Sequence, residues 1–277
     1  MQPIQIGAAL MVADLPRYRD WLIAGQRDLE IQDFLLPGVL TGDWQGRVAA
    51  AKDQLDGFSG RLGIHGPFYD LVLDMEDIEI APIVARRFET GVAAAAALGA
   101  AQMVIHSPFT TWDWFNFGNN LRTGNSPSDF EAKIARVAAL LAPAIARAEA
   151  EGITLVIENI EDIDPAQRRL LAQHLASDAV RLSIDTGHAH YAHHATGAPP
   201  VDYFIHDAGA MLAHIHLQDA DGFADRHWPP GRGTINWHAV FAAIAALPQR
   251  PHLVLELRDS ADIPAAMAWL EREGLAC

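Results

Sequence analysis

The sequence predicts an α/β fold, a closed (β/α)₈ TIM barrel, from its length, its composition and its alternation of elements. The chain has 277 residues, close to the roughly 250 that are typical of such a barrel. Half of the residues are hydrophobic and 20% are charged, so there is enough apolar material for a large core. Short β-rich apolar runs alternate with helical patterns to the end of the chain, which is typical of parallel barrels. We therefore expect a single domain over residues 1–277.

The predicted elements follow one another regularly. Eight strands are expected at 4–10, 28–35, 61–66, 102–107, 153–158, 180–185, 212–218 and 252–257. Crossover helices such as 82–98 and 127–150 join them, and the last helix is expected at 263–273. Three long irregular segments follow the fourth, sixth and seventh strands: 107–126, 189–202 and 219–236. We expect these to be loops at the carboxyl end of the barrel, where functional sites concentrate.

Charge and cysteine content limit the cellular setting. There are 20 Lys and Arg against 35 Asp and Glu, a formal charge of -15, which repels polyanions and argues against a nucleic-acid partner. The single cysteine, Cys277, cannot form an internal disulfide. The sequence begins MQPIQIGAAL, without a basic signal-peptide start, and contains no run of about 18 apolar residues. These features predict a cytoplasmic protein without membrane spans.

Ionisable residues stand at or next to the ends of six successive predicted strands: His65, His106, Glu158, Asp185, His216 and Glu256. In a parallel barrel the strand ends converge on one mouth, so these side chains should approach coordination distance. Buried together without a partner, such charges cost several kcal/mol each. A divalent cation would remove that cost. Mixed nitrogen and oxygen ligands suit Zn²⁺, Mn²⁺, Co²⁺ or Fe²⁺, and Mg²⁺ stays open as well.

Three more candidate ligands lie in the predicted loops. His188 follows Asp185 by one helical turn, and Asp225 and His227 lie two residues apart. A loop histidine taken alone is more often a hydrogen-bonded or exposed side chain. His214 shares a strand face with His216, and we expect it to be a deeper, supporting group.

Two further features are candidates for substrate binding. An aromatic run could wall a pocket or form a small core under a long loop: Trp112, Trp114, Phe115 and Phe117. Arg232, in a Pro-Pro-Gly-Arg-Gly turn, either contacts an anionic or hydroxylated ligand or is exposed to solvent.

Seven motifs carry a family resemblance: IHGPF at His65, VIHSP at His106, VIEN at Glu158, SIDTGH at Asp185 and His188, HIHLQD at His216, DRH at Asp225 and His227, and LELRD at Glu256. With these motifs the chain resembles the xylose isomerase-like TIM barrel superfamily. That superfamily contains sugar isomerases and epimerases, inosose-processing enzymes and the endonuclease IV family.

The resemblance implies two alternative metal sites. By similarity to the sugar epimerase branch, one metal ion is held by Glu158, Asp185, His216 and Glu256, and His188 contacts the substrate. By similarity to the endonuclease IV branch, all nine positions hold three zinc ions, and Glu158 bridges two of them. Both sets of ligand types are present in this sequence.

The leading hypothesis is a divalent-metal-dependent isomerase or epimerase of a sugar or sugar-like polyol or ketose, working by proton transfer through a metal-bound enediolate. Glu158 and Glu256 would exchange the proton, and the substrate-binding candidates are His188, Arg232, Trp112 and Trp114. One ion, such as manganese or zinc, suffices for this reaction.

Other activities stay open on the same scaffold. A phosphoester hydrolase of the endonuclease IV type would use up to three Zn²⁺ ions, and a lyase or dehydratase would use the same metal and bases. A barrel that binds a sugar or a partner without turnover is the non-enzymatic alternative. Related barrels often form dimers or tetramers, so a homo-oligomer stays open.

Overall fold

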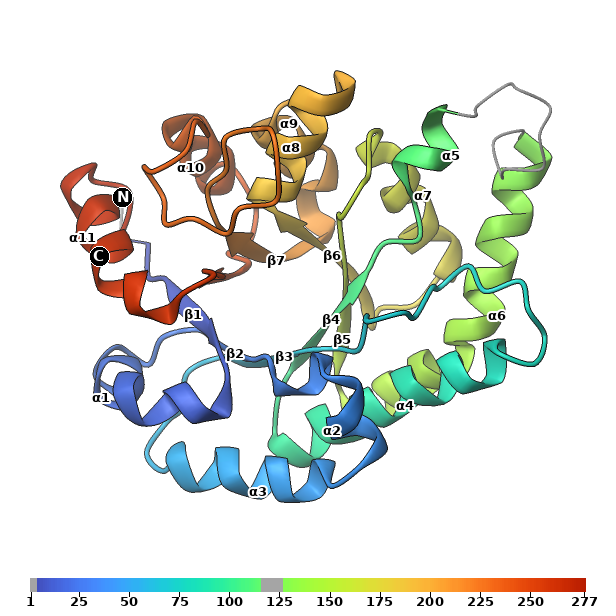
Figure 1. Ribbon diagram of the computed structural model, residues 1–277, viewed down its shortest axis with the longest axis horizontal. Helices are drawn as coiled ribbons and strands as arrows, with labels where there is room; N and C mark the ends of the chain where they lie inside the picture. The colour runs from blue at the N-terminus through green and yellow to red at the C-terminus, as the bar shows by residue number, and fades with distance from the viewer. Residues whose placement is uncertain (1–3, 116–126) are drawn as a thin grey trace.

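The computed structural model describes residues 4–115 and 127–277 and contains a closed barrel of parallel strands (Figure 1). The strands are β1 (Gly7–Leu10), β2 (Leu29–Ile31), β3 (Leu62–His65), β4 (Gln102–His106), β5 (Thr154–Glu158), β6 (Val180–Asp185), β7 (Leu212–Leu217) and β8 (His252–Leu255). Each strand pairs in parallel with the next along the chain, and β1 pairs with β8 to close the sheet. The predicted (β/α)₈ TIM barrel is confirmed.

Helices surround the barrel and connect its strands (Figure 1). The α-helices are α1 (Leu15–Gly25), α2 (Pro37–Thr41), α3 (Trp44–Gln54), α4 (Ala81–Leu98), α5 (Thr111–Phe115), α6 (Pro127–Glu151), α7 (Pro165–Leu175), α8 (Thr186–Thr196), α9 (Val201–Ala208), α10 (Trp237–Ala245) and α11 (Ile263–Arg272). The 3₁₀ helices are η1 (Val12–Asp14), η2 (Asp33–Leu35), η3 (Gly209–Met211) and η4 (Ser260–Asp262). Within the described ranges, no helix combines the length and apolar composition needed to cross a bilayer.

Helix α4 illustrates how local sequence sets an element. Pro82 lies in its first turn, where the missing N–H has no intrahelical partner to lose. Val84, Phe88 and Val92 follow at four-residue spacing and are buried, so one face of the helix packs on the barrel. Gly99 ends the helix with a φ of 83°, a left-handed conformation that glycine adopts without strain.

Some predicted segments differ from the structure. The irregular segment expected at 107–126 contains the helix α5 (Thr111–Phe115), because the side chains of Thr110 and Asp113 each accept a hydrogen bond from the other's backbone N and start a helical turn. The strand expected at 28–35 ends at Ile31, because Gln32 turns to helical angles and Asp33 Oδ2 accepts a hydrogen bond from the Val12 backbone N at 2.6 Å. The loop expected at 189–202 is wrong, since α8 and the start of α9 occupy most of it. The Asp185 side chain caps α8 by accepting from His188 N at 2.6 Å, and such a cap starts a helix directly after the strand.

The amino end of the barrel is held by polar contacts around Asp28, the residue before β2. Asp28 is 6% exposed. Its carboxylate accepts from Arg61 Nε at 2.7 Å and Nη2 at 2.6 Å, and from the Leu253 backbone N at 2.8 Å. These bonds tie the starts of β2, β3 and β8 together, at the end of the barrel opposite the strand termini described next.

We predict that Asp28→Asn lowers the free energy of unfolding by about 2 kcal/mol, because hydrogen bonds to a charged, buried group contribute more than neutral ones. Urea denaturation measures the change. Asp53→Asn, an exposed position on α3, is the matched control and should change little. An Asp28→Asn variant as stable as the native protein would contradict this account of the barrel's amino end.

Candidate functional site

Six ionisable side chains gather at the carboxyl end of the barrel. They are the last residues of β3 to β6, the penultimate residue of β7 and the residue after β8: His65, His106, Glu158, Asp185, His216 and Glu256. Strand register places His106 beside Glu158 and Asp185 beside His216. The closed barrel therefore brings together side chains that are far apart in the sequence.

Four of these side chains form the central cluster: Glu158, Asp185, His216 and Glu256. Each offers one ligand atom, and these atoms all lie within 4.8 Å of one another. All four residues are buried. His216 Nδ1 lies 2.9 Å from Glu158 Oε1 and 3.5 Å from Glu256 Oε2. Three carboxylates and one imidazole within reach of one point are a donor set that suits a divalent metal ion.

Two buried oxygens of the central cluster have no hydrogen-bond partner among the described residues, Glu158 Oε2 and Asp185 Oδ2. A buried carboxylate oxygen without a partner costs free energy. A cation held within the cluster would satisfy both oxygens. The residues therefore fit a divalent metal ion by donor type and by these two oxygens, which lack a hydrogen bond.

Burial and neighbouring charges shift pKa values in the central cluster. Burial raises the pKa of Asp185 to about 6. Burial alone would also raise the pKa of Glu158, but the His216 imidazole holds that pKa well below its ordinary value. Burial alone would lower the pKa of His216, yet the surrounding carboxylates, Glu256 foremost, raise it well above its ordinary value. Without a cation, protons on imidazole thus balance the carboxylates.

A first flanking cluster consists of His65, His106 and Glu158. The Nε2 atoms of both histidines lie 3.7 Å from Glu158 Oε2, so Glu158 belongs to two clusters. Burial lowers the pKa of His106 to about 3, which leaves its imidazole neutral and able to ligate. The Phe68 ring stacks on His106 with 4.2 Å between centroids and holds its orientation.

A second flanking cluster consists of His188, Asp225 and His227. Asp225 Oδ1 lies 3.5 Å from His188 Nε2, and Asp225 Oδ2 lies 3.1 Å from His227 Nε2. Burial alone would lower the pKa of His227, but its hydrogen bond to Asp225 and nearby carboxylates raise it to about 9. All nine predicted ligands thus lie in three groups at the barrel mouth.

Gln218, after β7, connects the central cluster with the second flanking cluster. Its Nε2 donates to Asp185 Oδ1 and to Asp225 Oδ1, both at 3.0 Å. Its Oε1 accepts from the backbone N of His227 at 3.0 Å. This fully buried amide therefore fixes the position of the loop residues relative to the strand residues.

Asp219 organises the rest of the 219–236 loop, which the structure confirms as non-helical. Its carboxylate accepts from the backbone N of Gly231 at 2.8 Å and of Ile235 at 3.2 Å, and from Trp237 Nε1 at 2.9 Å. Its backbone also pairs with that of Trp228 in an isolated bridge. The loop that presents Asp225 is thereby anchored at both ends.

A cavity of about 420 Å³ opens over the clusters. Seven of the nine predicted ligands line it, all except Asp185 and His216. Phe68 and Tyr69 supply aromatic walls, and Gln32 Nε2 donates to Glu256 Oε1 at 2.5 Å on the same lining. Among the described residues, no lysine or arginine lines this cavity. Its size and its polar floor suit a small molecule.

Three predicted substrate-binding residues lie elsewhere in the described part of the chain. Trp112 and Trp114, in α5, are 66% and 41% exposed and do not line the cavity. Arg232 does not line it either, and its guanidinium lies over the Trp228 ring, 4.9 Å from the centroid. Their roles in binding substrate stay predictions. Phe117 lies outside the described residues.

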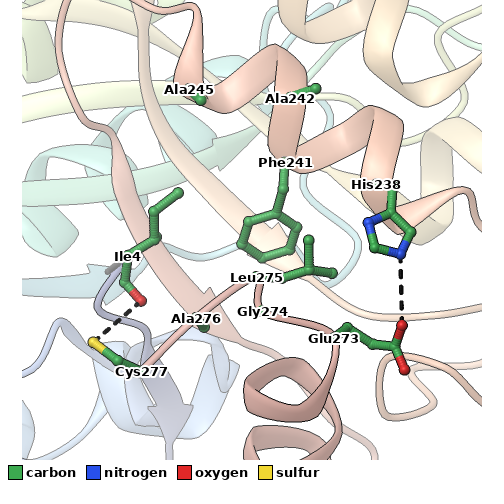
Figure 2. Close-up of a pocket in the computed structure, with 10 residues that line it drawn as sticks. All are labelled: Ile4, His238, Phe241, Ala242, Ala245, Glu273, Gly274, Leu275, Ala276 and Cys277. Atoms are coloured by element: carbon green, nitrogen blue, oxygen red, sulfur yellow. Dashed lines mark hydrogen bonds and ion pairs between the residues drawn. The ribbon is translucent and has the colours of Figure 1, made fainter. Parts of the chain in front are cut away.

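Figure 2 shows a second cavity, of about 560 Å³, between α10 and the C-terminal segment. Phe241 and Leu275 contribute to its largely apolar lining, and an ion pair joins His238 Nε2 to Glu273 Oε2 at 3.5 Å. The described lining includes none of the predicted site residues. The candidate site is therefore the cavity at the barrel mouth.

Sequence reasoning missed two residues of the site, Glu30 and Gln32. Glu30 lies in β2, and Gln32 is the residue that follows this strand. Glu30 is 2% exposed and lies between Leu29 and Ile31 in an apolar strand. Because side chains alternate along a strand, a charged residue inside such a run points into the barrel when its neighbours pack outward. That alternation was the available signal.

Comparisons with known proteins agree with this geometry. A family model described as xylose isomerase-like TIM barrel matches residues 40–273. The uncharacterised protein ML2432 of Mycobacterium leprae is 26% identical over 242 residues, 78% of each chain. The uncharacterised protein MJ1311 of Methanocaldococcus jannaschii is 21% identical over 190 residues, 66% of this chain. The match spans only 59% of that relative's length.

Solved structures share the fold. The TTHB071 protein from Thermus thermophilus, solved after soaking with ZnCl₂, is 26% identical with a TM-score of 0.72 and 97% coverage of both chains. A D-tagatose 3-epimerase-like protein is 17% identical, with a TM-score of 0.74 and coverage of 98% of this chain and 97% of that one. The 3-keto-D-glucoside 4-epimerase YcjR from E. coli is 17% identical, with a TM-score of 0.70 and coverage of 97% and 99%.

We predict that zinc binding releases protons and weakens as the pH falls from about 8 to about 6, because protonated imidazoles cannot ligate a metal. The raised pKa of His216, which belongs to the central cluster, means that its extra proton must leave when the ion binds. Calorimetry in buffers of different ionisation enthalpy counts the released protons. Binding without proton release would contradict this description of the metal-free cluster.

Proposed function

We propose that this chain, which belongs to the xylose isomerase-like TIM barrel family, is a divalent-metal-dependent isomerase or epimerase of a sugar or a related polyol. The observation that carries the proposal is the central cluster, where Glu158 and Glu256 approach the same His216 Nδ1 at 2.9 and 3.5 Å. Two potential bases thus lie next to a site whose donors suit a metal ion.

The cavity over the cluster supports a carbohydrate substrate. Hydroxyl groups can donate to the carboxylates and accept from the imidazoles that line it. Because the described lining holds no lysine or arginine, it offers no fixed cation for a phosphate group or a carboxylate. We therefore favour an uncharged ketose or inosose over a phosphorylated sugar.

The chemistry follows from the two carboxylates. When bound, a divalent cation would polarise the substrate's carbonyl and adjacent hydroxyl oxygens. Glu158 comes from the end of β5 and Glu256 follows β8, strands that are not neighbours in the barrel. One carboxylate removes the proton from the carbon next to the carbonyl, which leaves an enediolate, and the other returns a proton. Return to the other face of the same carbon gives an epimer, and return to the former carbonyl carbon gives an isomer.

Similar folds support this class of reaction. The structures that resemble this chain include proteins described as a D-tagatose 3-epimerase-like protein and a 3-keto-D-glucoside 4-epimerase. The zinc-soaked TTHB071 protein, at 26% identity, is consistent with a metal site in this barrel.

We predict that Glu158→Gln and Glu256→Gln each lower turnover by about 10³-fold or more, because an amide cannot carry the proton. The measurement is conversion of the substrate into its epimer or isomer, followed by NMR over a panel of ketoses and inososes. Glu271→Gln, at an exposed position on α11, is the control and should keep native activity. Native rates of conversion in either site variant would rule out that residue as a base.

The two flanking clusters favour a second candidate, a phosphoester hydrolase with three zinc ions. Each flanking cluster also offers three ligand atoms within 4.8 Å of one another, which is enough for an ion with an open coordination position. In this alternative His65, His106, His188, Asp225 and His227 are structural requirements of the metal site. In the isomerase they contact the substrate.

Metal content separates the two candidates. We predict about one tightly bound ion per chain by elemental analysis of protein purified without tag or chelator, and its retention in His106→Ala and His227→Ala, which do not belong to the central cluster. Nearly three ions, mostly zinc, with one ion lost in each variant, would contradict the isomerase and make phosphoesters the first substrates to test.

A further inference from the structure

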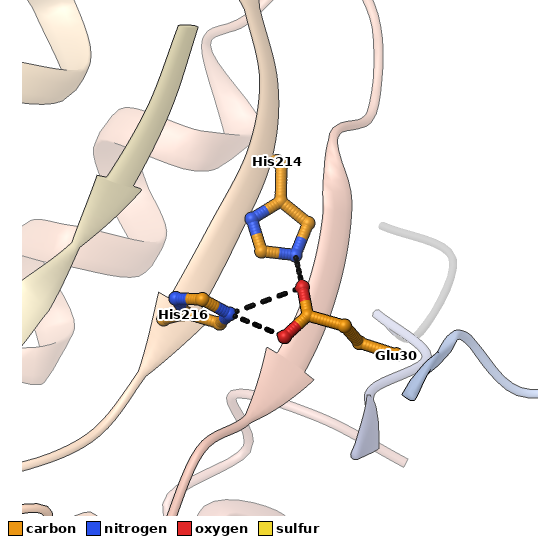
Figure 3. Close-up of side chains that lie close together, drawn as sticks. All are labelled: Glu30, His214 and His216. Atoms are coloured by element: carbon orange, nitrogen blue, oxygen red, sulfur yellow. Dashed lines mark hydrogen bonds and ion pairs between the residues drawn. The ribbon is translucent and has the colours of Figure 1, made fainter. Parts of the chain in front are cut away.

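Glu30 is a buried carboxylate that the proposed chemistry does not use. It is 2% exposed, and its side chain points toward His214 and His216 of β7 (Figure 3). Its Oε1 and Oε2 atoms lie 3.0 and 3.2 Å from His216 Nε2, and Oε2 lies 3.2 Å from His214 Nε2. Because β2 and β7 are not neighbours in the barrel, these contacts cross its interior.

The two ring nitrogens of His216 face different partners. Nδ1 faces the central cluster, 2.9 Å from Glu158 Oε1, whereas Nε2 faces Glu30. A neutral imidazole carries one proton, so Nδ1 can ligate an ion only when Nε2 holds that proton. Glu30 is placed to accept a hydrogen bond from Nε2–H and thus to select this tautomer.

Glu30 is itself held in place from the far side. His214 contacts Glu30 through Nε2 and hydrogen bonds to Ser183 Oγ through Nδ1 at 2.8 Å. All of these residues are buried. Ser183 and His214 therefore restrain the Glu30 carboxylate within the barrel. Through this carboxylate they also restrain the ring of His216.

We propose that Glu30 is a positioning residue of the candidate metal centre. Its carboxylate accepts the Nε2–H of His216, fixes the orientation of the ring and raises the basicity of Nδ1 toward the ion. Carboxylates placed in this way behind metal-bound histidines raise metal affinity. The inference rests on the proposed function only in taking His216 as a ligand in the central cluster, and it does not depend on the reaction.

The test is zinc affinity, measured by chelator competition on the full chain. Glu30→Leu removes the acceptor and should weaken binding by about 100-fold, and Glu30→Gln keeps an acceptor without the charge and should weaken it by about 10-fold. Asp28→Asn is the matched control. It alters a buried carboxylate two residues away that contacts Arg61 and Leu253 instead, so its zinc affinity should stay native.

Several results would overturn the proposal. Affinity within about twofold of native in folded Glu30→Gln is one, and an equal loss in Asp28→Asn is another, since it would indicate a general structural effect. Loss of one whole ion in both Glu30→Gln and His214→Phe, with the central affinity unchanged, would mean that Glu30 and His214 hold an ion of their own.

A second measurement does not depend on the variants. In the zinc-loaded native protein, ¹⁵N NMR should find His216 protonated at Nε2 and ligated through Nδ1, and ligation through Nε2 would refute the proposal. The native binding curve tests the metal dependence of the proposed function, whereas the ratio of variant to native affinity tests the role of Glu30. A native protein that binds no zinc would overturn both.

Discussion

The imidazole of His216 lies among three buried carboxylates, and the electrostatic cost of keeping these charges together constrains the whole site. Glu158 and Glu256 approach one ring nitrogen, and Glu30 approaches the other. Buried carboxylates at this spacing require a proton or a cation between them. When no ion is bound, the raised pKa of His216 keeps a proton on its imidazole between the carboxylates. A divalent metal ion would supply the cation instead. Under the proposed function, a metal ion that binds here takes the place of these protons.

The barrel makes this arrangement possible because the side chains of the central cluster lie in or directly after its strands and not in long loops. Glu158 and Asp185 end β5 and β6, and parallel pairing fixes their distance from His216. The loop residues depend on other supports. Gln218 holds Asp225 to the strand ends, and Asp219 anchors the segment around it. Strand geometry thus fixes the positions of the central cluster, while buried polar side chains fix those of the second flanking cluster.

Much of this could be predicted from the sequence, because a barrel converts strand ends into one site. The strand positions and the grouping of the nine candidate ligands follow from that rule.

Glu30 was missed because an apolar strand conceals an inward-facing charge, and Gln218 because a neutral amide carries no charge signal. Phe68 and Tyr69 line the cavity that the structure describes, and they were not predicted because loop packing depends on contacts between distant segments. A substrate-binding role of Trp112 and Trp114 stays a prediction. The sequence predicts a loop where α8 lies, because the Asp185 carboxylate is both a candidate metal ligand and the cap that starts this helix.

The most direct measurement is the position of bound metal in crystals of the zinc-loaded protein, located by anomalous diffraction at the zinc edge. We predict an anomalous peak between Glu158, Asp185, His216 and Glu256, with His216 Nδ1 facing the ion and Nε2 facing Glu30. An empty central cluster, or a peak between Glu30 and His214 instead, would contradict it.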